Sequence, residues 1–510
     1  MMKRKSIRVL GASALLVLLL PVANLTAWRT PDALPCCSRA SLFNVDALLG
    51  WVSAGLFRVG VSIAPDRSVI GKSDWLYLGD GYEGSLSQAR LPGRPDHVAK
   101  GQAFARGAAR WSAFFQSQGV RSFQIMVAPS KESIYPEFLP NWVHPPRHGV
   151  TDAIFQGLGT SVFEDLRVPL LAAKSHEPER LFFKFDTHWN MVGASYAFQA
   201  FAKRMKLLDP ELKWPDASSY QVFDLVSTDR GDLAEFLRLG SMSEKLPILE
   251  MNRLAPTFAR HGYGSGQVID PVGVAGARVS LTRPIVTKNA HALNRSRVLW
   301  LSDSFGAHLA DPMSTTFSDV VRVHWDRAYE DGGMLVRMVR EWNPDFVFVT
   351  VAERSLHGIK FETFLQYAPF PATEPSFDHL TAIPLAMRSV KGLAKGDEEG
   401  VFEVVSDAPS MMLSAPADID AMGGGAFLLA MTCLDKSASL PVQAFWKPSS
   451  AAGFDRDHAQ RFLHVGERSM VPLPEASIAK IRDVRLDLKT NGFCKRFRWD
   501  SLSFVGTEIP

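Results

Sequence analysis

The chain has 510 residues, of which 46% are hydrophobic, 10% aromatic and 21% charged, and its formal net charge is +3. This composition is that of a globular protein and argues against long disorder, and the length predicts two folded domains plus a targeting segment. The near-balance of charge gives no support for nucleic-acid binding, which requires a concentrated basic surface.

The first residues have the pattern of an export signal. Four basic residues between positions 3 and 8 precede an apolar run from Val9 to Ala23. Positive charge before such a run predicts a cytoplasmic N-terminus and an exported remainder. No clean small-x-small cleavage site follows, so residues 1–28 are predicted to be an uncleaved signal-anchor in preference to a cleaved signal peptide. We therefore expect the protein in the periplasm or cell envelope, anchored to the inner membrane.

The next part of the chain predicts a tether and then an α/β domain. Residues 29–64 are predicted to form the tether, with a short helix near residues 42–57. Between residues 65 and 365, short strands that are apolar nearly throughout alternate with amphipathic helices, which predicts a parallel sheet covered by helices on both faces. The predicted strands are residues 122–128, 297–302 and 346–351, and the predicted helices are residues 97–118, 191–207 and 332–342.

The pattern changes after Pro371, and a linker is predicted over residues 366–400. Residues 401–510 then show short strands separated by turn residues, which predicts a β-sandwich of the jelly-roll type. The predicted strands are residues 402–405, 426–433, 441–446, 462–465 and 484–488.

The chain has four cysteines, and export permits disulfides. Cys433 and Cys494 are candidates for a bridge between two strands, whereas the adjacent Cys36 and Cys37 do not suit a bond to each other. No CxxC pair or matching histidine spacing occurs, so we predict no metal site.

The strongest local signal is the strand of residues 297–302 running into Ser302-Asp303-Ser304. This order places Ser304 at the carboxyl edge of the sheet, where open α/β folds bind ligands. It also places the backbone N–H of Ser304 at a helix start, where a developing oxyanion needs a donor. Alternatively, Ser302 and Ser304 only cap the helix.

The second signal is Asp186-Thr-His188, which precedes the helix predicted from residue 191. A serine hydroxyl needs an adjacent base, and that base needs an orienting carboxylate. One short segment supplies both groups here. Taken alone, the segment is equally compatible with a surface histidine beside a capping aspartate.

Together, these signals belong to a longer ordered pattern. It comprises residues 70–80 (IGKSDWLYLGD), residues 127–131 (VAPSK), Tyr135-Pro-Glu with Leu139-Pro, Asp186-Thr-His188-Trp189, Gly231-Asp-Leu and Ser302-Asp-Ser-Phe. The pattern resembles the SGNH-like domain of the alginate O-acetyltransferases of bacterial exopolysaccharide systems and covers roughly residues 65–365. In that family, too, the Asp-x-His pair precedes the nucleophile.

The resemblance implies that Ser304 is the nucleophile, His188 the general base and then acid, and Asp186 the group that orients His188. One departure is Ser302, which stands where common relatives have glycine. Some relatives carry a carbohydrate-binding β-sandwich after the core, and the predicted C-terminal strands have a similar placement. Supporting or substrate-binding candidates are Lys131, Glu353, Arg354 and Trp189.

The expected activity is therefore a serine-dependent O-acetyltransferase that acts on an extracytoplasmic polysaccharide through an acetyl-serine. Neither a cofactor nor a metal is expected, and a membrane-bound acyltransferase is the expected source of acetyl groups. Two alternatives stay open: a carbohydrate acetylesterase with the same triad, and a noncatalytic glycan-binding or assembly protein with a vestigial site.

Overall fold

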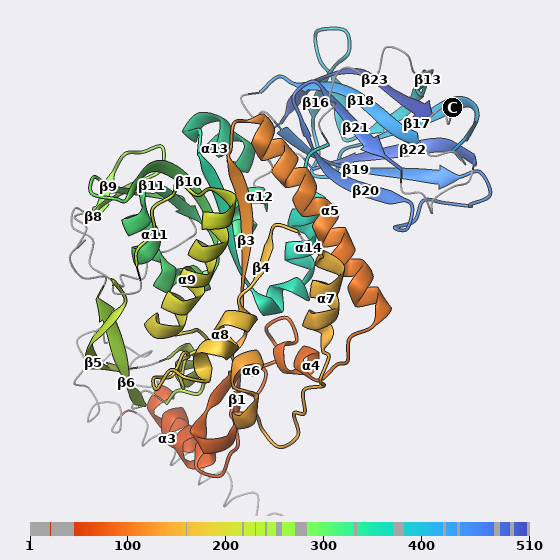
Figure 1. Ribbon diagram of the computed structural model, residues 1–510. Helices are drawn as coiled ribbons and strands as arrows, with labels where there is room; N and C mark the ends of the chain where they lie inside the picture. Colours follow the sequence, from red (N-terminus) through yellow and green to blue (C-terminus); the bar gives the residue numbers. More distant parts are fainter. Residues whose placement is uncertain are drawn as a thin grey trace, which may run out of the picture.

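The computed structural model describes Pro21 and residues 45–506, apart from residues 160, 217–218, 230, 240–241, 251–257, 271–282, 331–333, 371–381, 422–424, 436–438, 474–479 and 490–493. Most of the predicted signal-anchor, together with Cys36 and Cys37, lies outside the described residues. Figure 1 shows an α/β domain beside a smaller domain made of strands.

The α/β domain is built on an eight-stranded sheet. Its order is β4 (Phe163–Asp165), β3 (Ser122–Ala128), β12 (Phe346–Ala352), β10 (Asn294–Ser302), β11 (Phe317–Val323), β9 (Ile285–Asn289), β7 (Phe258–Gly262) and β8 (Val268–Asp270). The strands from β4 to β11 are parallel, as predicted, and include all three strands expected from the sequence.

The prediction of a parallel sheet is wrong at one edge, where β9, β7 and β8 pair antiparallel. The reason lies in the connections. Residues 263–267 alone separate β7 from its neighbour β8, which is too few for the crossover that a parallel pair requires. Residues 290–293 alone separate β9 from β10, so β9 runs opposite to β10 and therefore opposite to β11, the strand that lies between them in the sheet.

Helices cover both faces of the sheet. One face carries α5 (Pro95–Ser117), α7 (Val150–Leu158), α12 (Trp325–Glu330), α13 (Met334–Trp342) and α14 (Ile359–Gln366). The other carries α6 (Lys131–Ile134), α8 (Arg167–Lys174), α9 (Met191–Leu208) and α11 (Ala310–Thr316). Alternate residues of β12 pack in opposite directions, which explains why the strand is apolar throughout.

Smaller elements close one end of this domain. They are α3 (Asp46–Phe57), the hairpin of β1 (Ser68–Ile70) and β2 (Leu76–Leu78), α4 (Ser85–Ala89), α10 (Asp232–Phe236), and the hairpin of β5 (Gln221–Asp229) and β6 (Ser243–Glu250). None of the helices in the described part of the chain has both the length and the hydrophobicity needed to cross a membrane.

The C-terminal strands form two antiparallel sheets that enclose one apolar core, so this domain fits a β-sandwich. One sheet has the order β15 (Leu393–Lys395), β16 (Val401–Val404), β23 (Arg496–Gly506), β18 (Gly425–Cys433) and β21 (Arg468–Pro472), with β13 (Ala382–Pro384) also paired to β23. The other has the order β14 (Ala386–Lys391), β17 (Ser410–Asp420), β22 (Lys480–Leu488), β19 (Ser439–Pro448) and β20 (Ala459–Val465).

Two findings refine the expectations for this region. The segment predicted as a linker over residues 366–400 contains β13, β14 and β15, so part of it belongs to the sandwich. These strands are short and largely exposed, so no continuous apolar run marks them in the sequence. Cys433 and Cys494 form the proposed disulfide, with their Cα atoms 5.8 Å apart.

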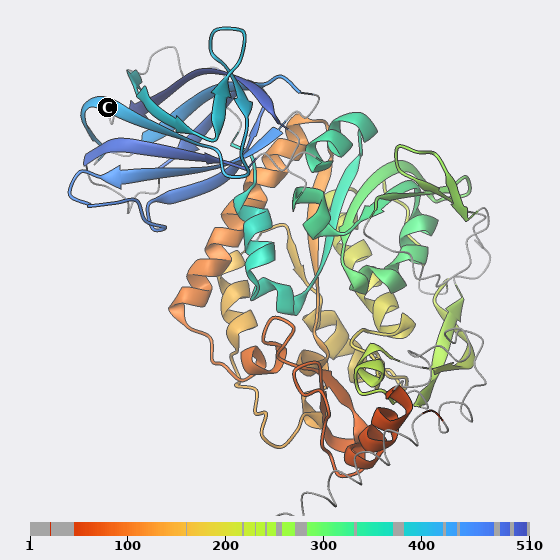
Figure 2. The ribbon, with the colours of Figure 1, turned by 180° about the vertical axis from the view of Figure 1, so that it is seen from behind.

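The two domains touch along α14 and β20. Leu463 of β20 packs into the apolar cluster that contains α5 and α14, and the Arg461 guanidinium donates a hydrogen bond of 3.3 Å to the Gln366 side chain. Figure 2 shows the sandwich close to one end of α5, viewed from behind.

Candidate active site

The structure brings Asp186, His188 and Ser304 together into a continuous hydrogen-bonded chain. The Nδ1 atom of His188 lies 2.6 Å from Asp186 Oδ1, and its Nε2 atom lies 2.8 Å from Ser304 Oγ. Ser304 is exposed at the start of the 3-10 turn η4 (Ser304–Leu309), directly after β10. The three side chains thus have the geometry of a serine nucleophile, a base and an orienting carboxylate.

The buried Asp303 anchors the turn that carries Ser304 through hydrogen bonds. Its carboxylate accepts hydrogen bonds from the backbone N–H groups of Phe305, at 2.9 Å, and Ala352, at 2.6 Å. Its own N–H donates to Thr350 O on β12 at 3.1 Å. The backbone N–H of Ser304 has no hydrogen-bond acceptor among the described residues, so it can serve as a donor to an oxyanion.

Ser302, which replaces the expected glycine, has a defined role in this turn. Its Oγ accepts a hydrogen bond of 2.7 Å from Nε of the half-buried Arg322, whose guanidinium also donates to Asp303 O at 3.2 Å. Burial lowers the pKa of Arg322 to about 10, so the side chain stays charged at neutral pH. The serine therefore gives a partly buried cation an acceptor, where the side chain of glycine would offer none.

The acid–base segment, residues 182–189 with Asp186 and His188, folds back on itself. The backbone N–H of His188 donates to Asp186 Oδ1 at 3.0 Å, and Phe182 and Trp189 form an isolated antiparallel bridge. Burial alone would raise the pKa of Asp186, but hydrogen bonds from His188 and the nearby histidine charge outweigh burial and hold that pKa well below its usual range. Asp186 is therefore an anion at neutral pH, as an orienting carboxylate must be.

Asp232 locks this segment in place. Its backbone N–H donates to Asp186 Oδ2 at 3.0 Å, and its carboxylate accepts from Thr187 N–H at 2.7 Å. The preceding Gly231 leaves no room for a side chain, because an added Cβ would lie 2.1 Å from Phe185 O. Gly231-Asp-Leu was part of the ordered motif pattern, but no role was predicted for Asp232. Its position in that pattern was the signal that could have identified it.

One ligand atom from each of Asp186, His188 and Asp232 lies within 4.8 Å of the others, which is a spacing that a metal ion accepts. Two of the possible ligand atoms, His188 Nδ1 and Asp186 Oδ1, already form a hydrogen bond with each other. The arrangement therefore suits proton transfer through His188 without a metal.

Residues 69–266 match the family model described as "SGNH hydrolase-like domain, acetyltransferase AlgX". The match covers less than half of the chain, and it shows that this region is similar to SGNH hydrolase-like acetyltransferase domains. The match includes Asp186 and His188, while Ser304 follows it in the chain. The family predicted from the ordered motifs is thereby confirmed.

Individual relatives are more distant. The chain is 27% identical over 229 residues to the probable alginate O-acetylase AlgJ of Pseudomonas putida, an alignment covering 42% of this chain and 54% of the relative, so it spans about half of that protein's length. It is also similar to solved structures of Bacillus cereus PatB1 with a sulfonyl adduct (19% identity, TM-score 0.43, 57% of this chain and 99% of that one). For the O-acetyltransferase domain of Pseudomonas putida AlgJ, the values are 17% identity, TM-score 0.36, and 57% and 92% coverage.

Two of the four supporting candidates, Trp189 and Lys131, lie beneath the site. Trp189 is fully buried and donates from Nε1 to Phe305 O at 3.0 Å, which ties the acid–base segment to the nucleophile turn. Lys131 was a candidate for substrate contact, but it is only 3% exposed and donates to Leu76 O at 2.8 Å and Lys184 O at 3.3 Å. It is a buried cation behind the triad and is unavailable to a substrate.

The surroundings of Lys131 partly compensate the cost of burying its positive charge. Burial lowers its pKa to about 8, and the charges of Asp186, Asp232, Glu244 and Glu132 oppose that change. Its ammonium group also lies over the rings of Trp75 and Tyr77. A positive charge here supports the anionic form of Asp186 through space.

The other two candidates, Glu353 and Arg354, are adjacent in the chain but contact different groups. Glu353 is buried and accepts hydrogen bonds of 2.9 Å from the Ser130 N–H and the Ser133 hydroxyl. The Arg354 guanidinium lies 5.6 Å from the ring centroid of Phe305, beside the nucleophile. The pair therefore diverges, and Arg354 is the one close to the triad.

Proposed function

We propose that this protein is a serine-dependent O-acetyltransferase in which Ser304 is the nucleophile, His188 the general base and acid, and Asp186 the group that orients His188. The observation that carries the proposal is the continuous chain from Asp186 through His188 to an exposed Ser304, at 2.6 and 2.8 Å. The AlgX-family match over residues 69–266 supports acetyl transfer as the chemistry.

In the first half-reaction, the Ser304 oxygen attacks the carbonyl carbon of an acetyl donor while His188 Nε2 takes the hydroxyl proton. The Ser304 N–H is a donor to the oxyanion that forms. The bond to the leaving group breaks, and His188 returns the proton to that group. In the second, a sugar hydroxyl loses its proton to His188 and attacks the acetyl-serine, after which the proton returns to Ser304 Oγ.

The acceptor in this proposal is an extracytoplasmic polysaccharide. The basic residues followed by the apolar run from Val9 to Ala23 support export. An exported enzyme needs acetyl groups delivered across the membrane, so a membrane-bound acyltransferase is the proposed donor partner. The β-sandwich is a proposed carbohydrate-binding domain that keeps the polymer near the site.

The test uses the purified full chain, an artificial acetyl ester, and oligosaccharide acceptors. We expect acetylated sugar to form in preference to free acetate, and both products to require Ser304. Free acetate at the same rate with and without every acceptor would indicate an acetylesterase instead. Oligosaccharide binding without any Ser304-dependent turnover would indicate a noncatalytic protein, and the proposal would be wrong.

A further inference from the structure

A cavity lined by polar and apolar residues lies on the same edge of the sheet as Ser304. Its volume is about 390 Å³, and its walls come from the residues after β3, β4 and β12, from the start of α7 and from α4. In the sheet, β12 is the direct neighbour of β10, which ends at the nucleophile turn. The cavity therefore occupies the position next to the nucleophile along the carboxyl edge, and the proposed mechanism gives it no task.

Arg354 joins this cavity to the triad. It forms part of the cavity wall, and its guanidinium lies 5.6 Å from the Phe305 ring centroid, which in turn lies 4.9 Å from the ring centroid of His188. Arg354 and Ser130 also line a much smaller hollow together with Thr187, the residue before His188. A ligand in the cavity would thus be adjacent to a group bound at Ser304.

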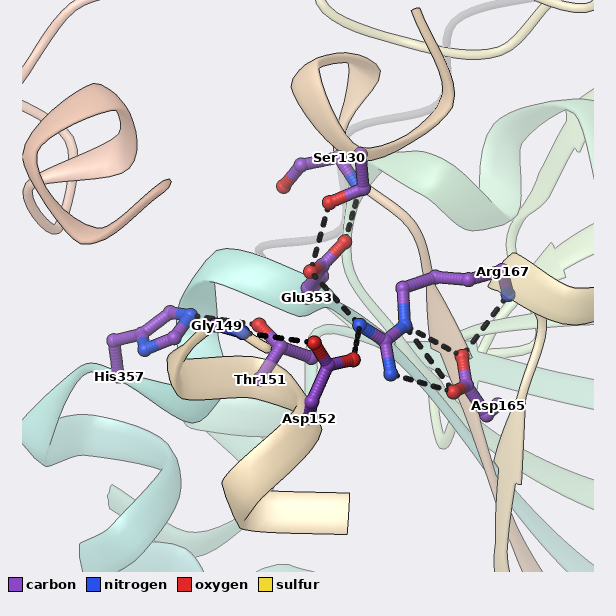
Figure 3. Close-up of polar contacts among 9 residues, drawn as sticks. Ser130, Gly149, Thr151, Asp152, Asp165, Arg167, Glu353 and His357 are labelled. Carbon is purple, nitrogen blue, oxygen red and sulfur yellow. Dashed lines mark hydrogen bonds and ion pairs between the residues drawn. The ribbon is translucent and has the colours of Figure 1, made fainter. Parts of the chain in front are cut away.

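The charges that line the cavity compensate one another. Arg167 forms the centre, with ion pairs of 2.8 Å to Asp152 and 2.7 Å to Asp165 and a longer contact of 4.0 Å to Glu353 (Figure 3). The remaining charged side chains of the wall are Arg147, Arg354 and Glu132. Burial raises the pKa of Glu132. Three arginines thus face four carboxyl groups, and no surplus of positive charge is left for a polyanion.

The wall also contains a buried polar atom with no partner. Ser130 is only 5% exposed and lines the cavity, yet its Oγ has no hydrogen-bond partner among the described residues. Buried hydroxyls are normally hydrogen-bonded, so an unpaired one at a cavity wall indicates a ligand group. Pro136, Pro145 and Pro146 add apolar surface to the same wall. Hydroxyl-binding groups beside apolar faces suit a sugar ring and do not suit a hydrocarbon chain.

We propose that this cavity binds an uncharged sugar ring of the acceptor, next to the ring whose hydroxyl is acetylated. The inference rests on the proposed function and specifies its acceptor: a neutral oligosaccharide at least two rings long, held by Ser130 and Arg354, and not a polyuronate. Carboxylates in the wall accept hydrogen bonds from ring hydroxyls, and the arginines and Ser130 donate to ring oxygens.

The first test fills the cavity. Ala89 of α4 lines it, so Ala89→Trp places a large side chain inside, and the exposed Ala103 of α5 offers the same substitution outside it as a control. With saturating acetyl ester, we expect Ala89→Trp to raise the KM for a neutral tetrasaccharide acceptor at least tenfold, with Ala103→Trp at the wild-type value. An unchanged acceptor KM in Ala89→Trp would overturn the proposal.

The second test removes the unpaired hydroxyl. Ser130→Ala keeps the backbone bond to Glu353, because that bond uses the main-chain N–H. We expect a three- to tenfold higher acceptor KM with little change in kcat. Thermal melting of each variant shows whether it is folded, and a folded Ser130→Ala protein with wild-type acceptor KM would contradict the assignment.

The third test addresses charge. Wild-type protein is given a panel of neutral tetrasaccharides, such as cellotetraose, and uronate tetrasaccharides, such as tetragalacturonate. We expect acetyl transfer to a neutral acceptor with a KM that 0.5 M NaCl leaves unchanged. Preference for a uronate that weakens with salt, or transfer to no neutral acceptor, would overturn the inference. Formation of acetyl-Ser304 without acceptor is measured first, so that a failure of the catalytic proposal is distinguished from a failure of the cavity.

Discussion

The two domains bury different kinds of residue. In the described part of the α/β domain, the buried side chains include the charged residues Lys131, Glu132, Arg260, Asp303 and Glu353. In the described part of the sandwich, the buried polar side chains are Ser414, Ser439, His464 and Ser469, and none of them carries a permanent charge. Burying a charge is costly unless it is paired and hydrogen-bonded, so a fold retains such groups where they have a task.

Four of these five buried charges, all except Arg260 within β7, follow the ends of strands β3, β10 and β12. Asp303 holds the nucleophile turn, Lys131 lies behind Asp186, and Glu353 anchors Ser130 at the cavity. The sandwich is held by an apolar core and a disulfide. The difference indicates that chemistry belongs to one domain, and that the other contributes stability and a surface.

The largest expected effect comes from breaking the triad without changing its shape. Asp186→Asn should lower kcat by roughly 10⁴-fold, because the amide no longer stabilises His188 in the required tautomer and charge state. The sandwich provides a matched pair, Asp455 and His458, with Oδ1 and Nδ1 2.8 Å apart. Asp455→Asn should leave turnover of an acetyl ester unchanged, and equal losses in the two variants would contradict the comparison.

Removing the disulfide should separate stability from chemistry. The double variant Cys433→Ser, Cys494→Ser opens a bridge between residues 61 positions apart, and we expect a loss of about 2–4 kcal/mol in the unfolding free energy of the sandwich. Ester turnover at 25 °C should stay close to wild type. Differential scanning calorimetry and initial rates measure both quantities, and a parallel loss of turnover would show that the sandwich shapes the site.

Ser302→Gly tests the hydrogen bond between Arg322 and Ser302, next to the nucleophile turn. The change leaves the Arg322 guanidinium without its acceptor at 2.7 Å, which should cost roughly 1–3 kcal/mol of stability and lower kcat more than KM. Ser414→Gly is its counterpart in the sandwich, where the serine Oγ donates to Asp483 at 2.7 Å. That variant should lose stability alone. Wild-type kcat in Ser302→Gly would show that Arg322 does not position the turn.

The smallest effect concerns acid stability. Burial, helped by nearby positive charges, lowers the pKa of His357 to about 4, whereas the unfolded chain titrates near 6.5. Between these pH values the unfolded state binds a proton that the folded state lacks, so stability falls as the pH falls from 6.5 to 4. His357→Gln should flatten that part of the urea-midpoint profile, and the exposed His176→Gln should not. Identical slopes would contradict burial of a neutral His357.

The helices and strands predicted correctly from the sequence are those with a strong local signal. The strand of residues 122–128 and the helix from Met191 have continuous apolar periodicity and occur with nearly the expected bounds. The antiparallel edge was missed because short turns, and not strand composition, set its direction. Strands β13 to β15 were missed because they are short and largely exposed, so they show no regular alternation of buried apolar residues.

The candidate triad was predicted by motif order, and the structure places its three side chains in contact. Lys131 and Glu353 were supporting or substrate-binding candidates because both follow a strand at its carboxyl edge, but side-chain direction there depends on tertiary packing. The hydrogen bond from Arg322 to Ser302 joins residues 20 positions apart, and neither local segment predicts it. Long-range pairing of this kind required the folded structure.

The most direct test of the central claim is the mass of the protein after brief exposure to an acetyl ester without acceptor. We predict a gain of one acetyl group, mapped by peptide fragmentation to Ser304, that is absent in Ser304→Ala and strongly reduced in His188→Ala. An acetyl group on any other residue, or turnover that persists in Ser304→Ala, would contradict the account.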